Sequence, residues 1–239
     1  MRILRSLIII QIGLPVVFSV SKHILVYGDS NSWGYLDDES GHRFDARWPV
    51  VMAAQLLADG HDITLTEECL PGRTTNIDDP QEGPQFNGAT PLPAILLSHQ
   101  PIDHVLIMLG TNDLKLRFSR RAADIVAAQI SLAEMAASTP CGTGGWTASN
   151  GPAVTLICPP HLGSRADEDD WQRVAEWRGG RAESLAMPAL LKSAAATAGI
   201  DVIDGNEYAA SSTRDPIHWD ADTHLRFGAG IASQMAARF

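Results

Sequence analysis

Apolar runs of strand length alternate with helical patterns from residue 22 to the C-terminus, and this alternation restricts the fold more than any other feature. The strand-like runs occupy residues 23–27, 63–70, 104–109, 153–158 and 200–203. Helical patterns follow them at residues 48–58, 92–99, 120–137, 181–198 and 221–237. Such alternation predicts a parallel sheet with helices on both faces. Right-handed crossovers make it one doubly wound α/β domain over residues 22–239.

Polar segments follow four of the predicted strands, at the carboxyl ends where sheets of this kind bind ligands. The first strand is followed by GDSN (residues 28–31), the second by LPGRTT (70–75), the third by GTND (110–113) and the fifth by DPIH (215–218). Each segment alone is ordinary turn chemistry. Because the topology brings all four to one rim, together they indicate a functional site.

The residue types on this rim suit acyl transfer. A serine hydroxyl such as that of Ser30 is a weak nucleophile and needs an adjacent base. His218 is the candidate base, since histidine titrates near neutrality and can carry a proton both ways. Asp215, three residues earlier, can accept the other imidazole N–H and fix the tautomer. We therefore predict a triad of Ser30, Asp215 and His218.

Donors for a developing oxyanion are present on the same rim. The backbone N–H of Ser30, at the start of a helix or turn, favours negative charge. The backbone N–H of Gly72 and the side-chain amide of Asn112 add two further donors. Trp33 and Tyr35 follow the nucleophile closely, and we expect them to bind substrate. The long loop over residues 71–89 exceeds a normal connection, which is typical of segments that shape a site or a subunit contact.

These segments resemble the Ser, Gly, Asn and His blocks of the SGNH, or GDSL-type, hydrolase family, at Ser30, Gly72, Asn112 and His218. Asp215 matches the aspartate of that family's Asp-x-x-His element. The runs RTTNIDDP (residues 73–80) and IMLGTND (107–113) look closest to the arylesterase/acyltransferase branch. The resemblance covers roughly residues 22–239. It implies a three-layer α/β/α, flavodoxin-like fold with a five-stranded parallel sheet in the order 2-1-3-4-5.

What the resemblance implies is a serine esterase that cleaves short-chain aryl or acetyl esters through an acyl-enzyme, with acyl transfer to alcohols as a further activity. It also implies a homo-oligomer. Carbohydrate acetylesterase and thioesterase activity on the same triad stay open as alternatives. Two positions depart from the family pattern. Asn31 replaces the usual Leu after the serine, and Pro216 replaces a common Gly and stiffens its turn.

Other classes of function fit the sequence less well. A nucleotide- or flavin-binding domain is disfavoured, because neither GxGxxG nor GxxxxGK[ST] follows any predicted strand. A non-catalytic binding protein on the same fold is the remaining alternative. A formal net charge of −10 argues against a nucleic-acid partner. We expect a small-molecule ester as the partner, with no metal and no cofactor, since the histidines are scattered and no HExxH occurs.

The N-terminus leaves the compartment open. Arg2 and Arg5 precede a short apolar stretch, interrupted at Gln11, Gly13 and Pro15. This pattern is too short and broken for a convincing transmembrane helix, and we expect no stable membrane insertion. Residues 1–21 are read either as a signal peptide or as the product of an upstream start site. The three cysteines cannot form a closed disulfide framework and favour a reducing compartment. We therefore expect a cytoplasmic protein, with export as the alternative.

Overall fold

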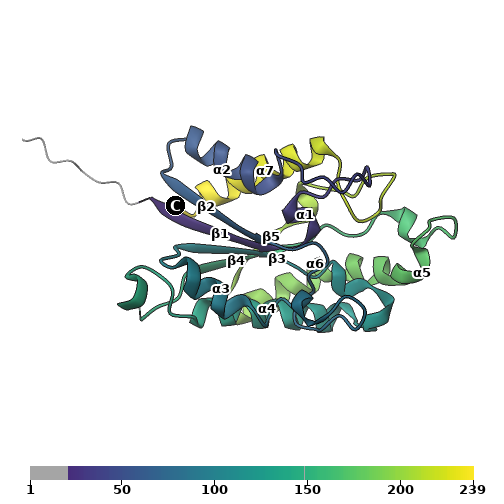
Figure 1. Cartoon of the computed structure of the whole chain (residues 1–239), viewed down its shortest axis with the longest axis horizontal. Coiled ribbons are helices and arrows are strands. Elements are labelled where there is room, and N and C mark those ends of the chain that lie inside the picture. Colours follow the sequence, from purple (N-terminus) through teal and green to yellow (C-terminus); the bar gives the residue numbers. More distant parts are fainter. Residues whose placement is uncertain (1–20, 148) are drawn as a thin grey trace, which may run out of the picture.

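The structure is a computed structural model, and it describes residues 21–147 and 149–239. The predicted extension over residues 1–21 lies outside the described residues except for Ser21. The remaining chain forms three layers, with a central sheet between two layers of helices (Figure 1).

The central layer is a five-stranded parallel sheet in the order β2-β1-β3-β4-β5. Its strands are β1 (Lys22–Gly28), β2 (Ile63–Cys69), β3 (His104–Met108), β4 (Ala153–Cys158) and β5 (Asp201–Asp204). All five side chains of β3 are buried, as expected of a central strand covered on both faces. The register pairs Gly28 of β1 with Cys69 of β2 and with Met108 of β3, so these three strands end side by side.

One face of the sheet is covered by α2 (Trp48–Ala58) and α7 (Ala221–Ala236), which pack against each other (Figure 1). Pro49 stands in the first turn of α2, where its missing N–H costs nothing. Trp48 meets Phe227 of α7 edge to face, with ring centroids 5.3 Å apart, inside a core that also contains Ile24 and Val26 of β1.

The other face is covered by α3 (Leu92–His99), α4 (Ala122–Ser138) and α6 (Gly180–Ala198) (Figure 1). This side holds the larger apolar core, built on residues such as Leu25, Val105 and Ile107 of the sheet. Alternate residues of β1 therefore enter opposite cores, as the two-residue period of a strand requires. Helix α6 ends at Gly199, whose φ of 68° is in the left-handed region that favours glycine.

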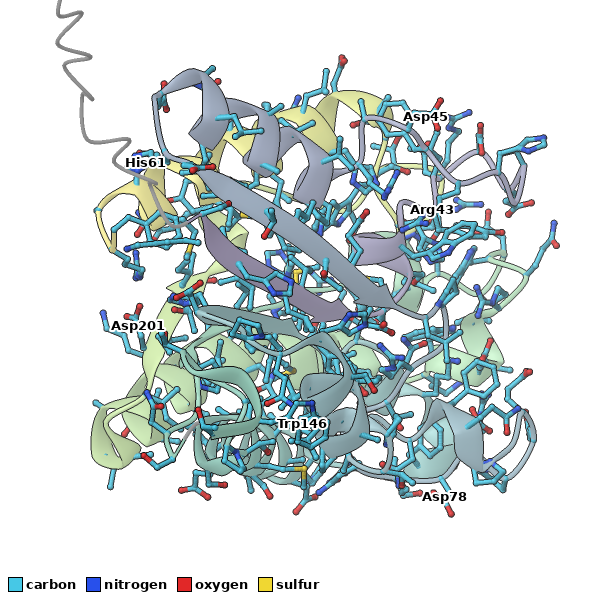
Figure 2. All side chains as sticks on the ribbon, turned by 60° about the vertical axis from the view of Figure 1, so that its left-hand side comes forward. Arg43, Asp45, His61, Asp78, Trp146 and Asp201 are labelled. Atoms are coloured by element: carbon cyan, nitrogen blue, oxygen red, sulfur yellow. The ribbon has the colours of Figure 1, made fainter. Side chains whose placement is uncertain are left out.

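The short elements gather where the strands end. They include α1 (Ser30–Trp33), α5 (Val174–Trp177) and the 3₁₀ turns at Asn112–Leu114 and Leu116–Phe118. Figure 2 places Asp78, in the loop after β2, at the opposite end of the molecule from Asp201, the first residue of β5. The carboxyl ends of the strands thus share one rim with the long loop over residues 71–89.

The predicted fold class and strand order are confirmed, and each predicted element is present within about two residues of its expected bounds. The largest difference is at α4, which begins at Ala122 instead of residue 120. The Asp124 carboxylate caps that start by accepting a hydrogen bond from the Arg121 backbone N–H at 3.0 Å. Within the described ranges, no helix combines the length and apolar character that a membrane span needs.

Candidate active site

Ser30, His218 and Asp215 form one hydrogen-bonded chain at the rim of the sheet. The Nε2 atom of His218 lies 3.0 Å from Ser30 Oγ, and its Nδ1 atom lies 2.6 Å from Asp215 Oδ2. With the proton on Nδ1 and donated to Asp215, Nε2 is free to accept the serine hydroxyl proton. The structure thus brings together the three residues that the sequence predicts as a triad, in the geometry of an activated nucleophile.

Ser30 is held at the start of α1, directly after β1. The Asp29 carboxylate caps this single turn by accepting a hydrogen bond from the Asn31 backbone N–H at 3.1 Å. Burial raises the pKa of Asp29 to about 7, although the Asn31 bond and the Arg73 charge oppose the rise. The helix ends at once at Gly34, whose φ of 95° turns the chain back. The nucleophile therefore projects from a short, sharply bounded turn.

The loop that carries His218 is organised by Asp215. Its Oδ1 atom accepts hydrogen bonds from the backbone N–H groups of Ile217 at 2.8 Å and His218 at 3.3 Å. Burial opposes ionisation of Asp215, but the bond and charge of His218 together with these two donors hold its pKa below the usual value. Asp215 is therefore a carboxylate at neutral pH, able to stabilise an imidazolium at His218.

Two rings pack behind and beside the triad. The Tyr35 ring lies 4.5 Å from the His218 ring between centroids, and His224 packs between Trp219 and Phe44. His224 lies in α7, fully buried. Its ring nitrogens make no hydrogen bond of normal geometry to the described residues, and burial lowers its pKa to about 4. His224 is thus a neutral packing residue, separate from the triad.

The predicted oxyanion donors face the same place from two further loops. Gly72 has a φ of 90°, and a Cβ there would approach the Phe86 ring to 3.1 Å. No acceptor within the described part of the chain takes the Gly72 backbone N–H. Asn112 donates one amide hydrogen to the Arg73 carbonyl at 3.1 Å, which orients the amide and leaves its second hydrogen available.

Arg73 fixes the Gly72 loop to the strand that carries the nucleophile. Its guanidinium donates to the Gly28 carbonyl at 3.2 Å and to the Glu68 carbonyl. It also lies over the Tyr27 ring, 4.2 Å from the centroid. The ends of β1 and β2 are therefore tied together directly behind Gly72. Sequence reasoning placed Arg73 in a matching motif but gave it no role.

Asp113 supports the loop on its other side. Its carboxylate accepts hydrogen bonds from the Thr75 backbone N–H at 2.9 Å and the Thr75 hydroxyl at 2.5 Å, and it pairs with Arg120 at 2.7 Å. Asp113 is fully buried, so these donors replace the water that a carboxylate needs. This network fixes the start of the 71–89 loop beside Asn112.

A cavity of about 270 Å³ opens onto the triad. Its walls include Ser30, His218, Gly72 and Asn112, together with Tyr35, Pro71, Glu82, Phe86, Lys115, Arg173, Trp177 and Ile217. Phe86 and Glu82 belong to the long loop that the sequence expected to shape the site. Lys115 and Arg173 were not predicted. The signal for Lys115 was its place three residues after Asn112, within one turn, whereas nothing in the sequence marked Arg173.

The two predicted substrate-binding aromatics separate in the structure. Tyr35 lines the cavity, whereas Trp33 is not among its wall residues. Trp33 instead lies under Arg43, whose guanidinium carbon is 5.5 Å from the ring centroid and whose Nε donates to the Trp33 carbonyl. Gly34, with a left-handed φ of 95°, lies between the two residues in the chain. Trp33 therefore lies outside the cavity wall, packed against Arg43.

The described residues contain no group of three or more His, Cys, Asp or Glu side chains arranged to hold a metal ion.

Solved structures with similar folds include two esterases. The M. smegmatis aryl esterase is 33% identical, with a TM-score of 0.82, over 92% of this chain and all of that one. Est24, a carbohydrate acetylesterase from Sinorhizobium meliloti, is 34% identical, with a TM-score of 0.81, over the same shares.

A curated arylesterase from Vibrio mimicus is 35% identical over 100 residues. That match spans only 42% of the length of either protein. The model of the GDSL-like lipase/acylhydrolase family matches residues 26–228, which include every residue of the triad and both oxyanion loops. The chain therefore belongs to the GDSL-like lipase/acylhydrolase family.

Proposed function

We propose that the protein is a serine esterase that cleaves short-chain acyl esters, aryl or sugar acetates in particular, through an acyl-enzyme. The observation that carries this proposal is the unbroken hydrogen-bonded chain from Ser30 Oγ through His218 to Asp215 at the wall of an open cavity. The aryl esterase and carbohydrate acetylesterase among the similar structures support the same substrate range.

The proposed reaction has two steps. Ser30 Oγ attacks the ester carbonyl carbon while its proton passes to His218 Nε2, and the carbonyl electron pair moves onto the oxygen as an oxyanion. The N–H groups of Ser30, Gly72 and Asn112 stabilise that charge. When the oxyanion collapses, the carbon–oxygen bond to the leaving alcohol breaks and His218 donates its proton to that alcohol. The product is an acyl-enzyme on Ser30.

Water completes the cycle by the same groups in reverse order. It attacks the acyl carbon while His218 takes one of its protons, and the second oxyanion occupies the same donors. Collapse breaks the bond to Ser30 Oγ, which takes the proton back from His218 as the carboxylic acid leaves. Asp215 stabilises the imidazolium in both steps and does not itself take the proton.

Turnover of p-nitrophenyl esters of increasing chain length tests the proposal. We expect acetate and butyrate to be hydrolysed faster than octanoate, because the charged side chains of Glu82, Lys115 and Arg173 in the cavity wall disfavour a long apolar chain. Ser30→Ala should lower kcat by on the order of 10⁴-fold or more and should abolish labelling by a fluorophosphonate probe. Wild-type labelling at another serine, or full activity of the variant, would refute the nucleophile assignment.

Aryl and sugar leaving groups are separated by a second assay, the release of acetate from acetylated monosaccharides. Charged and polar side chains of Glu82, Lys115 and Arg173 stand beside the aromatic ones in the cavity wall, an arrangement that suits a hydroxyl-rich leaving group as well as an aryl one.

We propose a cytoplasmic location, which the free cysteines Cys69, Cys141 and Cys158 support. Export is the alternative, and N-terminal sequencing of the protein from its native cell distinguishes the two. Loss of the first 21 residues would favour export.

A further inference from the structure

Two cations stand in the wall of the catalytic cavity, and the proposed reaction on a neutral ester uses neither. Lys115 follows Asn112 by a single 3₁₀ turn, and its backbone N–H donates to the Asn112 carbonyl at 3.3 Å. Arg173 stands at the start of α5. Both charges lie near the face of Trp177, with Lys115 Nζ 5.7 Å and the Arg173 guanidinium carbon 5.6 Å from its centroid. We call Lys115 and Arg173 the cationic wall.

The Lys115 ammonium is poorly compensated for a buried charge. Lys115 is only 6% exposed, and its nearest carboxylate oxygen, Glu176 Oε1, is 3.8 Å away. No hydrogen bond from its Nζ to another described residue is present. Burial, followed by the nearby Arg117 charge, lowers the pKa of Lys115. An anion in the cavity would therefore gain from a charge that the protein has already desolvated.

Glu176 does not neutralise the cationic wall, because it is shared. Its carboxylate also accepts hydrogen bonds from Arg117 at 2.9 Å and from Arg173 Nε at 3.0 Å. Arg117 has a second partner in Asp79 at 2.6 Å. Within this network three cations meet two carboxylates, and the third carboxylate at the cavity, that of Glu82, forms no ion pair with any of them among the described residues. Glu82, the acidic residue of the cavity wall, is on an exposed part of the opposite loop.

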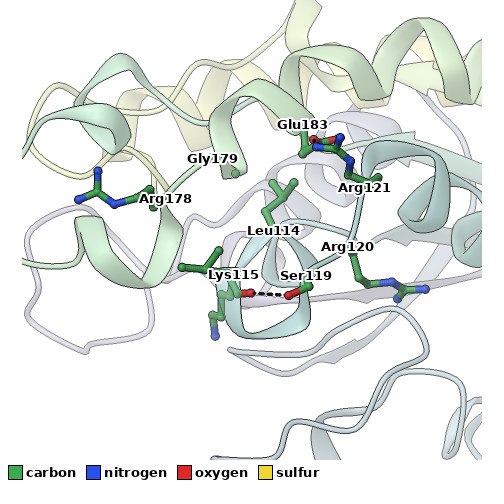
Figure 3. Close-up of a pocket in the computed structure, with 10 residues that line it drawn as sticks. Leu114, Lys115, Ser119, Arg120, Arg121, Arg178, Gly179 and Glu183 are labelled. Atoms are coloured by element: carbon green, nitrogen blue, oxygen red, sulfur yellow. Dashed lines mark hydrogen bonds and ion pairs between the residues drawn. The ribbon is translucent and has the colours of Figure 1, made fainter.

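A second cavity of about 220 Å³ carries more arginines but does not concentrate their charge. Figure 3 shows the charged ends of Lys115, Arg120 and Arg178 pointing in different directions. Arg121 turns to Glu183, with 2.8 Å between their charged atoms. Lys115 and Arg173 also line an adjoining cavity of about 700 Å³ together with Arg117 and Glu82, so both cations face open space beside Ser30 and next to it.

We propose that the cationic wall selects esters that carry a carboxylate close to the scissile bond. This inference rests on the proposed esterase activity and specifies its substrate class. The carboxylate would bind Lys115 Nζ and the Arg173 guanidinium while the ester carbonyl occupies the oxyanion donors beside Ser30. The acidic group belongs either to the leaving alcohol or to the acyl chain, and two pairs of substrates separate these arrangements.

The first pair is 4-acetoxybenzoate, which carries the charge on its leaving group, and its neutral methyl ester. The second pair is mono-p-nitrophenyl glutarate and p-nitrophenyl valerate, which place it on the acyl chain. Each kcat/KM is divided by the rate constant of alkaline hydrolysis of the same ester, so that leaving-group chemistry cancels. Background hydrolysis is subtracted with the Ser30→Ala variant. The readout is the ratio of the charged to the neutral ester.

We expect a ratio of about ten or more in one of the pairs, the usual effect of a charge-assisted hydrogen bond. Lys115→Met, which keeps the packing against Trp177, should lower that ratio roughly tenfold. Arg173→Gln should act in the same direction and is the safer variant for folding, because its side chain is 43% exposed. Arg178→Gln removes the same charge from an exposed site outside the catalytic cavity and should leave the ratio unchanged.

A ratio of one or less in both pairs would overturn the inference, as would a preference for the charged ester that survives both Lys115→Met and Arg173→Gln. Neutral esters are hydrolysed in either case if the proposed function holds. No turnover of any ester by the wild type would instead contradict the esterase proposal, and with it this selectivity.

Discussion

The side-chain amide of Asn31 donates a hydrogen bond of 3.1 Å to the backbone carbonyl of Ile217, 186 residues later in the chain. Asn31 directly follows the nucleophile, and Ile217 directly precedes the base. This buried contact therefore joins the two loops whose spacing sets the distance between Ser30 Oγ and His218 Nε2. A leucine, the residue usual at this position in the family pattern, has no donor for that carbonyl.

Asn31→Leu should leave the fold intact and lower kcat several-fold. The variant leaves the Ile217 carbonyl without its donor, and a lost hydrogen bond of this kind costs about 1 kcal/mol. KM should change less, because the contact lies behind the triad. Steady-state kinetics with p-nitrophenyl acetate and a thermal melt measure both effects. An unchanged kcat would show that the two loops hold their spacing without this bond.

His218→Ala should be nearly inactive, whereas His224→Phe should keep most of the wild-type activity. His218 contacts both Ser30 and Asp215, while His224 packs neutral among aromatic rings that a phenyl ring can contact equally well. Initial rates with the same ester distinguish the two variants. If His224→Phe were inactive and His218→Ala active, the assignment of the base would be wrong.

Asn112→Ala should lower kcat by about 10²–10³-fold, the usual effect of losing one oxyanion donor. KM should change much less, since the interaction strengthens only as negative charge develops on the carbonyl oxygen. The two constants are separated by steady-state kinetics. A large rise in KM at constant kcat would instead make Asn112 a residue that binds the ground state.

The His224→Phe variant should lose less stability than the wild type when the pH falls from 7 to 5. The pKa of His224 is about 4 in the folded protein and 6.5 ordinarily, so the unfolded chain takes up this proton first as the pH falls. Burial of the neutral imidazole therefore contributes its full stability above pH 6.5, and this contribution decreases as the pH falls towards 4. The loss reaches about 3 kcal/mol for a shift of this size. Urea unfolding of both proteins at pH 7 and pH 5 measures it. If both proteins lost the same stability between pH 7 and pH 5, the lowered pKa of His224 would be contradicted.

The acyl-enzyme should also transfer its acetyl group to a primary aromatic alcohol in mostly aqueous buffer. An alcohol held in the cavity against Tyr35, Phe86 and Trp177 gains effective concentration over water. Chromatography of the products from an acetate ester and benzyl alcohol measures the ratio of transfer to hydrolysis. Free acid alone at every alcohol concentration would identify a plain hydrolase.

Two tryptophan variants serve as a matched pair for this measurement. Trp177→Ala should lower the ratio of transfer to hydrolysis, because it removes an apolar wall of the cavity. Trp33→Ala should leave it unchanged, because Trp33 lies under Arg43 and outside the cavity wall. If Trp33→Ala lowered the ratio and Trp177→Ala left it unchanged, Trp33 would be a substrate-binding residue.

The sheet and the main helices could be predicted because their signals are local. Buried strands such as His104–Met108 are short apolar runs, and α4 has a clear helical period. The triad could be predicted because parallel strands end at one rim, so that segments as distant as Ser30 and His218 must meet there.

The walls of the cavity could not be predicted in the same way, because tertiary contacts decide where loop side chains point. Arg117 bonds to both Asp79 and Glu176 and thereby ties the 71–89 loop and α5 to one turn. These ion pairs join segments whose sequences share no recognisable pattern. Arg173 reaches the cavity wall as part of the same arrangement. In the sequence, Trp33 and Tyr35 are equally good candidates for substrate binding. Only the structure distinguishes them, across the turn at Gly34.

The separation of the nucleophile and its base along the chain also has a consequence for folding during synthesis. Ser30 is synthesised 188 residues before His218, and helix α7 follows His218 in the chain. A nascent chain therefore carries an inert serine until His218 has emerged and its loop has packed beside Ser30. Esterase activity thus reports that these two distant segments have met, and its recovery during refolding should coincide with the packing of the His218 loop beside Ser30.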